Sequence, residues 1–174
     1  GSIITTCGYA TTDFDLWPET SKMILVLLMF IGACAGSTGG GFKISRLLIL
    51  CKAIPKQLSL VIHPREVKVI RMDGKPIDHN TLRSTNVYLA IYFFILLVST
   101  LLISVDNFNL TTNFTAVAST LNNIGPGLDG VGPTRSFGMY SDFSKFVLMF
   151  DMLAGRLELY PLLILFMPSL WRRK

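Results

Sequence analysis

Two short stretches of the chain carry residues suited to holding a dehydrated cation with backbone oxygens. Residues 5–9 read TTCGY and residues 122–126 read NNIGP. Backbone carbonyls replace the hydration shell of an ion in potassium-selective filters, and glycine lets the chain turn such carbonyls to one side. Either stretch alone is also typical of an ordinary turn. Together they predict two ion-binding stretches, formed by Thr5, Thr6, Cys7 and Gly8 and by Asn123, Ile124 and Gly125.

A third stretch, GACAGSTGGGFK at residues 32–43, is rich enough in glycine to suggest a phosphate-binding loop. That loop has the pattern G-x-x-x-x-G-K-[ST] after a strand. Gly36 and Gly41 have the required separation, but Phe42 occupies the lysine position and Lys43 comes one residue late. The residues in front, SKMILVLLMFI, form a long apolar run. We therefore interpret the glycines as a break within a membrane helix, with nucleotide binding as the less favoured alternative.

The composition is typical of a membrane protein. Apolar residues make up 51% of the 174 residues and charged residues 16%, against about 25% charged residues in soluble domains. Residues 84–105 contain no charge, and at about 1.5 Å per residue they are long enough to cross a hydrocarbon core of about 30 Å. The mid-chain position of this span excludes a signal peptide.

Basic residues gather in one segment of the chain. Nine basic and three acidic residues lie between Lys43 and Arg83, and the tail WRRK adds three more basic residues. The other predicted loops carry mostly acidic residues: Asp13, Asp15, Glu19, Asp106, Asp129 and Asp142. This asymmetry places residues 43–83 and the C-terminus in the cytoplasm. It disfavours nucleic acid as a partner.

The predicted elements place the ion-binding stretches in a helical framework. We expect a helical run from Lys22 to Ile54 that is broken by the glycines, a spanning helix over 84–105 and a last helix over 142–169. Residues 112–121 predict a helix too short to span a membrane, which ends where the glycines and proline of NNIGPG stop it. Irregular backbone at membrane depth survives only where protein buries it or where it lines a water-filled path. This short helix and the turn after it therefore predict a re-entrant pore loop.

The segment EVKVIRMDGKPID, with Asp73-Gly74 as its turn signal, predicts a small cytoplasmic β-hairpin. The order of features also repeats: a glycine turn and an acidic loop precede both SKMILVLLMF and SKFVLMFDML, about 120 residues apart. The predicted fold is thus an all-α integral membrane protein of potassium-channel-like helix–pore-loop–helix repeats, present in one and a half copies. Its predicted parts are residues 1–54, 55–83 and 84–174.

Three charged residues, Asp151, Arg156 and Glu158, lie within the last predicted helix. A charge in mid-membrane costs about 2.5–3.5 kcal/mol on insertion scales, so these side chains must face a bundle interior or an aqueous path. We expect Asp151 or Glu158 to pair with Arg156, or Arg156 to lie beside the ion path.

The remaining reactive residues carry no catalytic or metal-binding pattern. The three cysteines show no metal spacing and are expected to pack as small apolar residues, while the two histidines are expected to be solvated: Cys7, Cys34 and Cys51, and His63 and His79. No motif predicts an enzyme.

Four segments together resemble the C-terminal part of the bacterial Trk-type potassium uptake proteins of the Trk/Ktr/HKT superfamily. These segments are TTCGY, GACAGSTGGGFKISR, NNIGPGL and MLAGRLELYPLLILFMPSLWR. The resemblance implies four repeats around one pore, of which residues 1–54 hold the third filter and inner helix and residues 84–174 hold the complete fourth repeat. Cys7 stands where a threonine is expected.

The resemblance also implies roles for particular residues. The transported K⁺ ions are bound through Thr6, Cys7, Asn123 and Ile124. An intramembrane loop obstructs the pore and consists of Gly36, Ser37, Thr38, Gly39, Gly40 and Gly41, with Arg156 as a pore-facing charge near it. The implied partners are a cytoplasmic nucleotide- and NAD-binding regulatory ring on the basic face, the remaining N-terminal repeats, a second protomer and membrane lipid. No tightly bound cofactor is expected.

The sequence thus predicts potassium uptake across the bacterial cytoplasmic (inner) membrane through a carbonyl-lined selectivity filter, with sodium or proton symport left open. Two pore loops cannot enclose a fourfold site, so conduction needs the missing repeats. The alternative is a secondary transporter whose broken helices bind a small substrate at the membrane midplane.

Overall fold

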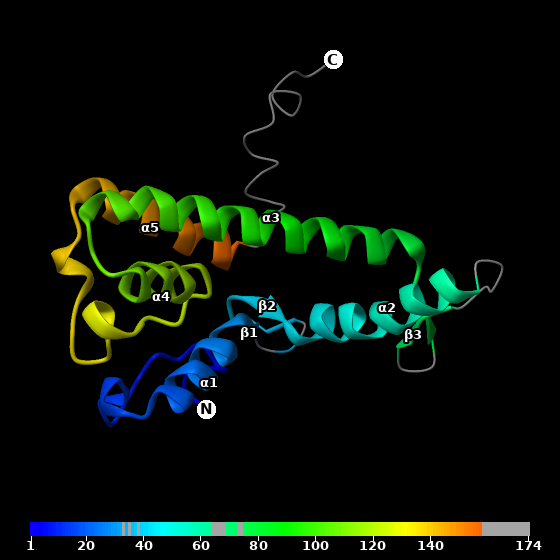
Figure 1. Ribbon diagram of the computed structural model, residues 1–174, viewed down its shortest axis with the longest axis horizontal. Helices are drawn as coiled ribbons and strands as arrows, with labels where there is room; N and C mark the ends of the chain where they lie inside the picture. Colours follow the sequence, from blue (N-terminus) through cyan, green and yellow to red (C-terminus); the bar gives the residue numbers. More distant parts are fainter. Residues whose placement is uncertain (33, 35, 38, 64–68, 73–74, 158–174) are drawn as a thin grey trace, which may run out of the picture.

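The computed structural model describes residues 1–32, 34, 36–37, 39–63, 69–72 and 75–157, and these residues are mostly helical. Its α-helices are α1 (Glu19–Phe30), α2 (Ile44–Ile62), α3 (His79–Ile103), α4 (Leu110–Leu121) and α5 (Asp142–Arg156). Short strands are β1 (Ile31–Gly32), β2 (Phe42–Lys43), β3 (Arg71–Met72) and β4 (Lys75–Pro76), and 3₁₀ turns are η1 (Phe14–Leu16), η2 (Ser104–Asp106), η3 (Asp129–Val131) and η4 (Phe137–Met139). The long helix α3 runs the length of the molecule, with α4 and α5 beside one half and α2 beside the other (Figure 1).

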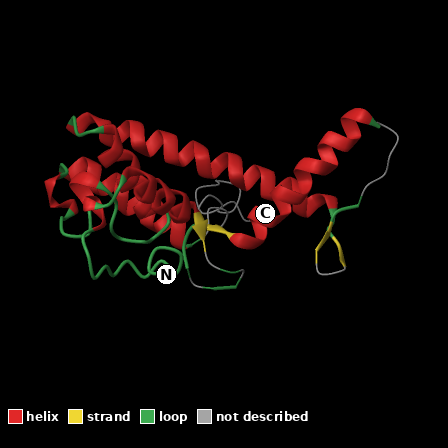
Figure 2. Cartoon of the chain, turned by 60° about the horizontal axis from the view of Figure 1, so that its bottom comes forward, coloured by secondary structure: helices red, strands yellow, loops and turns green. Residues whose placement is uncertain are grey.

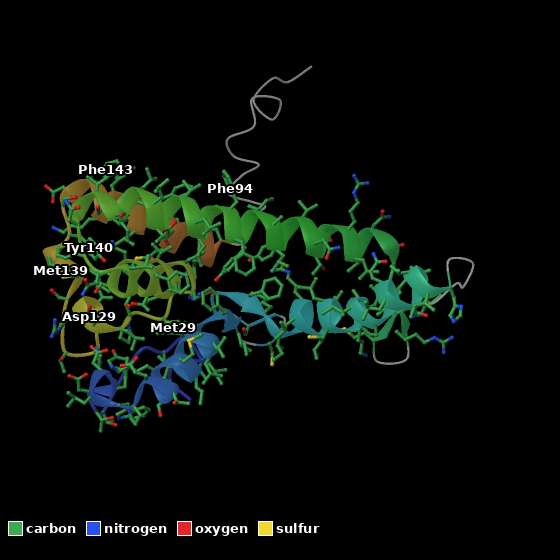
Figure 3. The ribbon with its side chains drawn as sticks, viewed as in Figure 1. Met29, Phe94, Asp129, Met139, Tyr140 and Phe143 are labelled. Atoms are coloured by element: carbon green, nitrogen blue, oxygen red, sulfur yellow. The ribbon has the colours of Figure 1, made fainter. Side chains whose placement is uncertain are left out.

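Helix α3 is, among the described residues, the one helix long and apolar enough to cross a membrane. The span runs from Asn80 to Asp106 with a mean hydropathy of 2.4, and only a third of its most apolar window is buried within the chain. Several of its large side chains project outward, as Phe94 does at 67% exposure, together with Phe143 of α5 (Figure 3), whereas Tyr88, Tyr92 and Leu96 are buried. The helix predicted over residues 84–105 is present, and α3 already begins at His79 because the polar residues before Ser84 are also helical.

The glycine-rich stretch interrupts a helical run, as the sequence predicts. Helix α1 ends at Phe30, and α2 begins at Ile44. Strands β1 and β2 flank the interruption and pair in parallel, with Ile31 opposite Phe42. Gly36 and Gly41 adopt left-handed φ angles of 85° and 80°, which a residue with a Cβ adopts only with strain.

Helix α2 differs from the prediction at its far end. The expected end near Ile54 is wrong, because α2 continues through Pro55 to Ile62. Proline removes one backbone hydrogen bond and crowds the carbonyl four residues earlier. That carbonyl belongs to Cys51, which is exposed, so the helix continues at limited cost.

The predicted cytoplasmic hairpin is present as two very short strands. Strands β3 and β4 pair antiparallel, with Arg71 opposite Pro76 and Met72 opposite Lys75. The hairpin lies at one end of the molecule, away from the β1–β2 pair (Figure 2). The predicted turn Asp73-Gly74 lies outside the described residues.

The short helix α4 lies at the centre of the core. Nine of its residues are buried, and it packs against both α3 and α5. Gly155 of α5 comes so close to the end of α4 that a Cβ there would overlap the Leu121 carbonyl oxygen. The short helix is confirmed, as is the start of the last helix at Asp142. The predicted continuation of that helix to Ser169 lies outside the described residues.

Two minor expectations have different outcomes. The cysteines do not pack as apolar residues: Cys7, Cys34 and Cys51 are all exposed. Cys7 and Cys34 lie in irregular backbone, and Cys51 lies on an exposed turn of α2, so no neighbouring element covers them. His63 is exposed, as expected. The side chain of His79 lies outside the described part of the chain.

Candidate functional site

The two predicted ion-binding stretches adopt the same backbone arrangement. In each, a helical turn ends with three hydrogen bonds whose donors and acceptors match at a constant offset of 117 residues, as from Cys7 to Ile124. In the first stretch, the amides of Thr5, Thr6 and Cys7 donate to the carbonyls of Gly1, Ile3 and Ser2 over 3.1, 3.1 and 3.0 Å. In the second, the amides of Asn122, Asn123 and Ile124 donate to the carbonyls of Ala118, Thr120 and Ser119 over 3.1, 3.0 and 2.9 Å.

Both stretches also have left-handed backbone at two positions that are two residues apart. Thr6 and Gly8 have φ angles of 54° and 78°, and Asn123 and Gly125 have φ angles of 55° and 112°. A left-handed residue directly after a helix, with these crossed amide–carbonyl bonds, is a helix C-terminal cap. The cap turns the chain away from the helix axis, so that successive carbonyls no longer point along it.

The first stretch lies directly against the second. A Cβ added to Gly8 would overlap the carbonyl oxygen of Ile124 and lie 3.2 Å from Pro126 Cδ. Only a glycine fits at this crossing. The residues predicted to bind K⁺ therefore come from two stretches that touch, although they are far apart in the sequence.

The glycine loop lies against Asn122, the residue directly before the second stretch. A Cβ on Gly40 would overlap the carbonyl oxygen of Asn122, and one on Gly41 would lie 2.7 Å from Asn122 Oδ1. Ser37 Oγ is buried and has no hydrogen-bond partner among the described residues. Thr38, also predicted for this loop, lies outside the described residues. The loop thus comes within van der Waals contact of the residue that precedes Asn123.

A small cavity joins this loop to the last helix. It measures about 140 Å³ and is lined by Ser37, Gly39, Gly41, Lys43, Tyr88, Gly155 and Arg156. Three of the predicted loop residues, Ser37, Gly39 and Gly41, therefore line the same cavity as Arg156.

The expected pairing of Asp151 with Arg156 is not observed. Ser99 Oγ of α3 donates to Asp151 Oδ1 over 2.7 Å, and Asp151 is fully buried. Side chains on one face of a helix are three or four residues apart, so Asp151 and Arg156, five apart, point in different directions. Glu158, the other expected partner, lies outside the described residues.

Asn122 is a site residue that sequence reasoning did not identify. It is fully buried, accepts a hydrogen bond from Tyr92 Oη over 2.8 Å, and donates from Nδ2 to the Ala118 carbonyl over 2.7 Å. The signal in the sequence was Tyr92, one of two tyrosines within the uncharged span of residues 84–105. Two further contacts hold the stretch: Ser119 Oγ donates to the Gly125 carbonyl over 2.7 Å, and Asn123 Nδ2 donates to the Met152 carbonyl over 3.1 Å.

The loops that follow the two stretches are joined by acidic side chains. Asp15 Oδ1 accepts from the amide of Asp129 over 2.9 Å, and Asp13 Oδ2 accepts from the Thr134 hydroxyl over 3.2 Å. The Thr112 hydroxyl donates to Asp129 over 2.7 Å, and this bond holds the pKa of the Asp129 carboxyl below its usual range. A cavity of about 460 Å³ lies among these groups, and its lining has four acidic residues against two basic ones, Lys22 and Arg135, a balance that favours cations over anions.

The helices and the irregular backbone between them are typical of one class of protein. A long apolar helix with outward-facing side chains, a helix broken by glycines and a buried short helix that ends in irregular backbone are typical of an integral-membrane transport protein.

Comparison with known proteins gives the family. The family model TrkH, a cation transport protein, matches residues 2–173. The Trk system potassium uptake protein TrkH of Vibrio parahaemolyticus is 40% identical over 171 residues, and that of Escherichia coli strain K12 is 36% identical over 171 residues. The crystal structure of the potassium transporter TrkH from Vibrio parahaemolyticus matches with a TM-score of 0.87 at 39% identity. The chain belongs to the TrkH family of cation transport proteins.

The matches cover nearly all of this chain but only part of each relative. They include 98% of the chain, 35% of the length of the two relatives and 36% of the crystallised chain. The resemblance to Trk-type proteins noted from the sequence is confirmed.

Proposed function

We propose that this chain is the C-terminal part of a membrane protein that takes up K⁺, and that the two touching stretches form half of its selectivity filter. The observation that carries the proposal is the contact between Gly8 and the Ile124 carbonyl, made by two stretches with the same cap and the same left-handed positions. The relatives named as potassium uptake proteins support K⁺ as the ion.

In the proposed filter, the ion is held by backbone oxygens of Thr6, Cys7, Asn123 and Ile124 in place of its hydration shell. Helix α4 directs its C-terminal end at the second stretch. A helix C-terminus carries about half a negative charge, and α4 is buried, so this charge is poorly screened by solvent. The arrangement favours a cation at Asn123 and Ile124. We propose that α4 and the following turn are a pore loop and that the matched bonds reflect a repeat.

We further propose that the loop of Gly36–Gly41 gates the pore from below. Its support is the close approach of Gly40 and Gly41 to Asn122, together with the cavity that the loop shares with Arg156. An Arg guanidinium there would oppose cation occupancy by repulsion. Deleting Gly39–Gly41 in the full-length protein should raise K⁺ flux. Gly138→Ala is the control, because Gly138 lies in η4 outside the loop and does not have a left-handed φ; an unchanged or lower flux after the deletion would leave the loop merely structural.

The proposed setting follows from the charge asymmetry. Residues 43–83 and the C-terminus face the cytoplasm of a bacterium, and the acidic loops after each filter stretch face outward. The basic face would contact a nucleotide- and NAD-binding regulatory ring, and the whole protein would form a homodimer and work as a uniporter or a symporter. Missing repeats complete the pore.

Selectivity measurements test the filter assignment. In the full-length protein reconstituted in liposomes, Gly125→Ser should lower the preference for K⁺ over Na⁺, because its φ of 112° is accessible essentially to glycine alone. Gly138→Ser, in η4 away from the filter, is the control. An unchanged K⁺/Na⁺ permeability ratio in Gly125→Ser would count against the assignment.

A further inference from the structure

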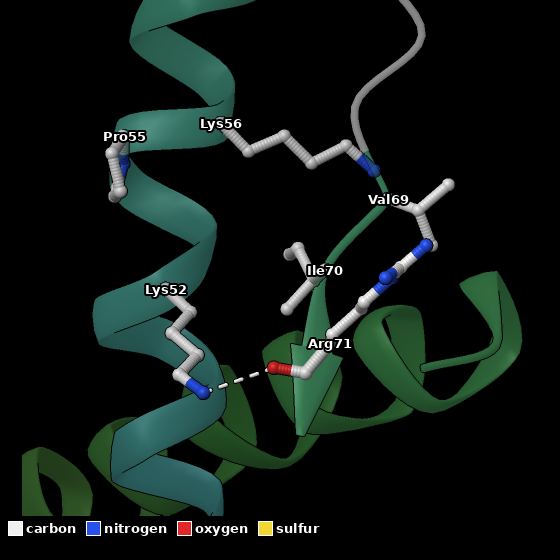
Figure 4. A pocket seen from close by; sticks show the side chains of 6 residues that line it. All are labelled: Lys52, Pro55, Lys56, Val69, Ile70 and Arg71. Atoms are coloured by element: carbon white, nitrogen blue, oxygen red, sulfur yellow. Dashed lines mark hydrogen bonds between the residues drawn. The ribbon is translucent and has the colours of Figure 1, made fainter. Parts of the chain in front are cut away.

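A third, chemically different pocket lies between the middle of α2 and strand β3. It measures about 290 Å³ and is lined by Lys52, Pro55, Lys56, Val69, Ile70 and Arg71. Lys52 and Lys56 extend from successive turns of α2 toward strand β3, and Ile70 lies between them (Figure 4). The ends of Lys56 and Arg71 both lie beside Val69 (Figure 4). The pocket therefore presents three cationic groups around an apolar floor.

The positive charge of this pocket is not balanced by the lining residues. The three cations Lys52, Lys56 and Arg71 are accompanied by no carboxylate. Lys52 Nζ donates to the Arg71 carbonyl over 2.9 Å, which fixes one amine and leaves two of its donors available. In the part of the chain that the structure describes, neither Lys56 nor Arg71 has a carboxylate partner. Like charges four residues apart disfavour a helix, so an anion between these side chains would relieve their repulsion.

The shape of the pocket favours an anion with an apolar body. Pro55, Val69 and the buried Ile70 form its apolar walls. On the opposite face of α2, Ile54, Leu58 and Val61 are 60, 61 and 80% exposed. A helix that is cationic on one face and apolar on the other is typical of the membrane interface, and basic pockets on the cytoplasmic side of membrane helices bind lipid head groups.

We infer that this pocket binds the phosphate of an anionic phospholipid. Arg71 and Lys56 contact the phosphate oxygens, Lys52 holds the strand against α2, and the glycerol end of the lipid packs on Val69 and Ile70. A free phosphate offers the same anion but makes no use of the apolar wall. That the phosphate belongs to a lipid rests on the membrane topology proposed above. That the pocket binds an anion does not.

Photo-crosslinking with a labelled lipid tests this site in the full-length protein. The probe is phosphatidylglycerol with a photoreactive group near its glycerol, incorporated into phosphatidylcholine vesicles, and the readout is its yield on peptides containing residues 52–56 or 69–71. The variant Lys56→Gln/Arg71→Gln should bind about 30-fold more weakly, since each basic residue near a lipid surface contributes about 1 kcal/mol, or about fivefold. Arg83→Gln is the matched control, because Arg83 is exposed on α3 and does not line the pocket.

The outcomes separate the possible ligands. Unchanged labelling in the double variant overturns the site. Displacement of the label by inorganic phosphate as efficiently as by unlabelled phosphatidylglycerol overturns the lipid source and assigns a soluble anion. Lys56→Arg/Arg71→Lys, which keeps both charges, should keep the labelling. The thermal unfolding midpoint of the Gln variant, compared with that of the unmodified protein, shows whether its loss of labelling reflects misfolding. Because K⁺ flux is not the readout, failure here leaves the proposed transport function untouched.

Discussion

The two stretches proposed for the filter, taken with the turns that precede them (residues 1–8 and residues 118–125), share a backbone conformation but not their surroundings. In the second, Asn122 is fully buried and accepts a hydrogen bond from Tyr92, and Ser119 Oγ donates a hydrogen bond to the Gly125 carbonyl. In the first, Cys7 is exposed, and Ser2 Oγ, which matches Ser119 at the same offset, is buried with no partner among the described residues. Among the described residues, the same backbone conformation is therefore found once with buried hydrogen-bonding side chains around it and once without them.

This difference separates two influences on the backbone of each stretch: the residues of the turn itself and the buried hydrogen bonds around it. The cap and the left-handed positions recur in both stretches, so the helix end and the glycine specify the turn locally. Among the described residues, the network around Asn122 supports only the second stretch, so the turn itself forms without it. Fixed carbonyl positions make an ion filter selective in one view of such filters, which is why the supporting residues are useful targets.

The largest effect is expected from the glycine where the stretches cross. Gly8→Ser should abolish selective K⁺ flux and lower the thermal unfolding midpoint, because a Cβ would overlap the Ile124 carbonyl in addition to about 1–3 kcal/mol of backbone strain. Gly125→Ser carries the strain alone, since a Cβ there meets no atom within 4 Å. Liposome flux and thermal unfolding of both full-length variants give the comparison. Equal loss in the two would contradict the contact between the stretches.

A second test separates support of the filter from support of the fold. Tyr92→Phe removes the donor to Asn122 Oδ1, and a buried acceptor left alone costs about 1–3 kcal/mol. Tyr140→Phe is a close match, because Tyr140 Oη donates over 3.0 Å to the buried Asn113 Oδ1 away from the filter. Both variants should lose similar stability, measured by thermal unfolding, but only Tyr92→Phe should lower the K⁺/Na⁺ permeability ratio. A matching fall in Tyr140→Phe would remove the special role of Asn122.

A smaller effect is expected from the two matching serines. Ser119→Ala loses the bond to the Gly125 carbonyl, worth about 1 kcal/mol, and should raise Na⁺ permeability modestly. Ser2→Ala removes a hydroxyl without a described partner and should change it less. Sodium flux through the two full-length variants is the measurement. If Ser2→Ala has the stronger effect, the first stretch has a support that the described residues lack.

The smallest effect concerns the ion pairs that open α1 and α5. Glu19 pairs with Lys22 over 3.0 Å and Asp142 with Lys145 over 3.5 Å, both three residues apart and solvent-exposed. Such pairs contribute less than about 0.5 kcal/mol. Glu19→Gln and Asp142→Asn should therefore leave the unfolding midpoint nearly unchanged. A clear drop in only one would show that the matching positions of the two helices are not equivalent.

The sequence predicted the elements well where a local signal fixes them. The glycines before Phe42 break a helix, NNIGPG ends α4, and Asp73-Gly74 marks a hairpin, because each acts on its own backbone. The contacts that position the site were not predicted. Tyr92 and Asn122, or Ser99 and Asp151, lie 30 and 52 residues apart, and periodicity carries no information about such pairs. The prediction also ended this helix at Ile54, before Pro55, whereas α2 continues to Ile62; whether proline stops a helix depends on its surroundings.

The most direct measurement is the position of the ions themselves. Crystals of the full-length protein grown with Rb⁺ or Tl⁺, which scatter anomalously and replace K⁺, locate the bound cations. We predict anomalous density between the backbone carbonyls of residues 6–7 and 123–124, above the loop of Gly36–Gly41. Ordered ions elsewhere in the pore, with none at these carbonyls, would contradict the assignment of the two stretches as a filter.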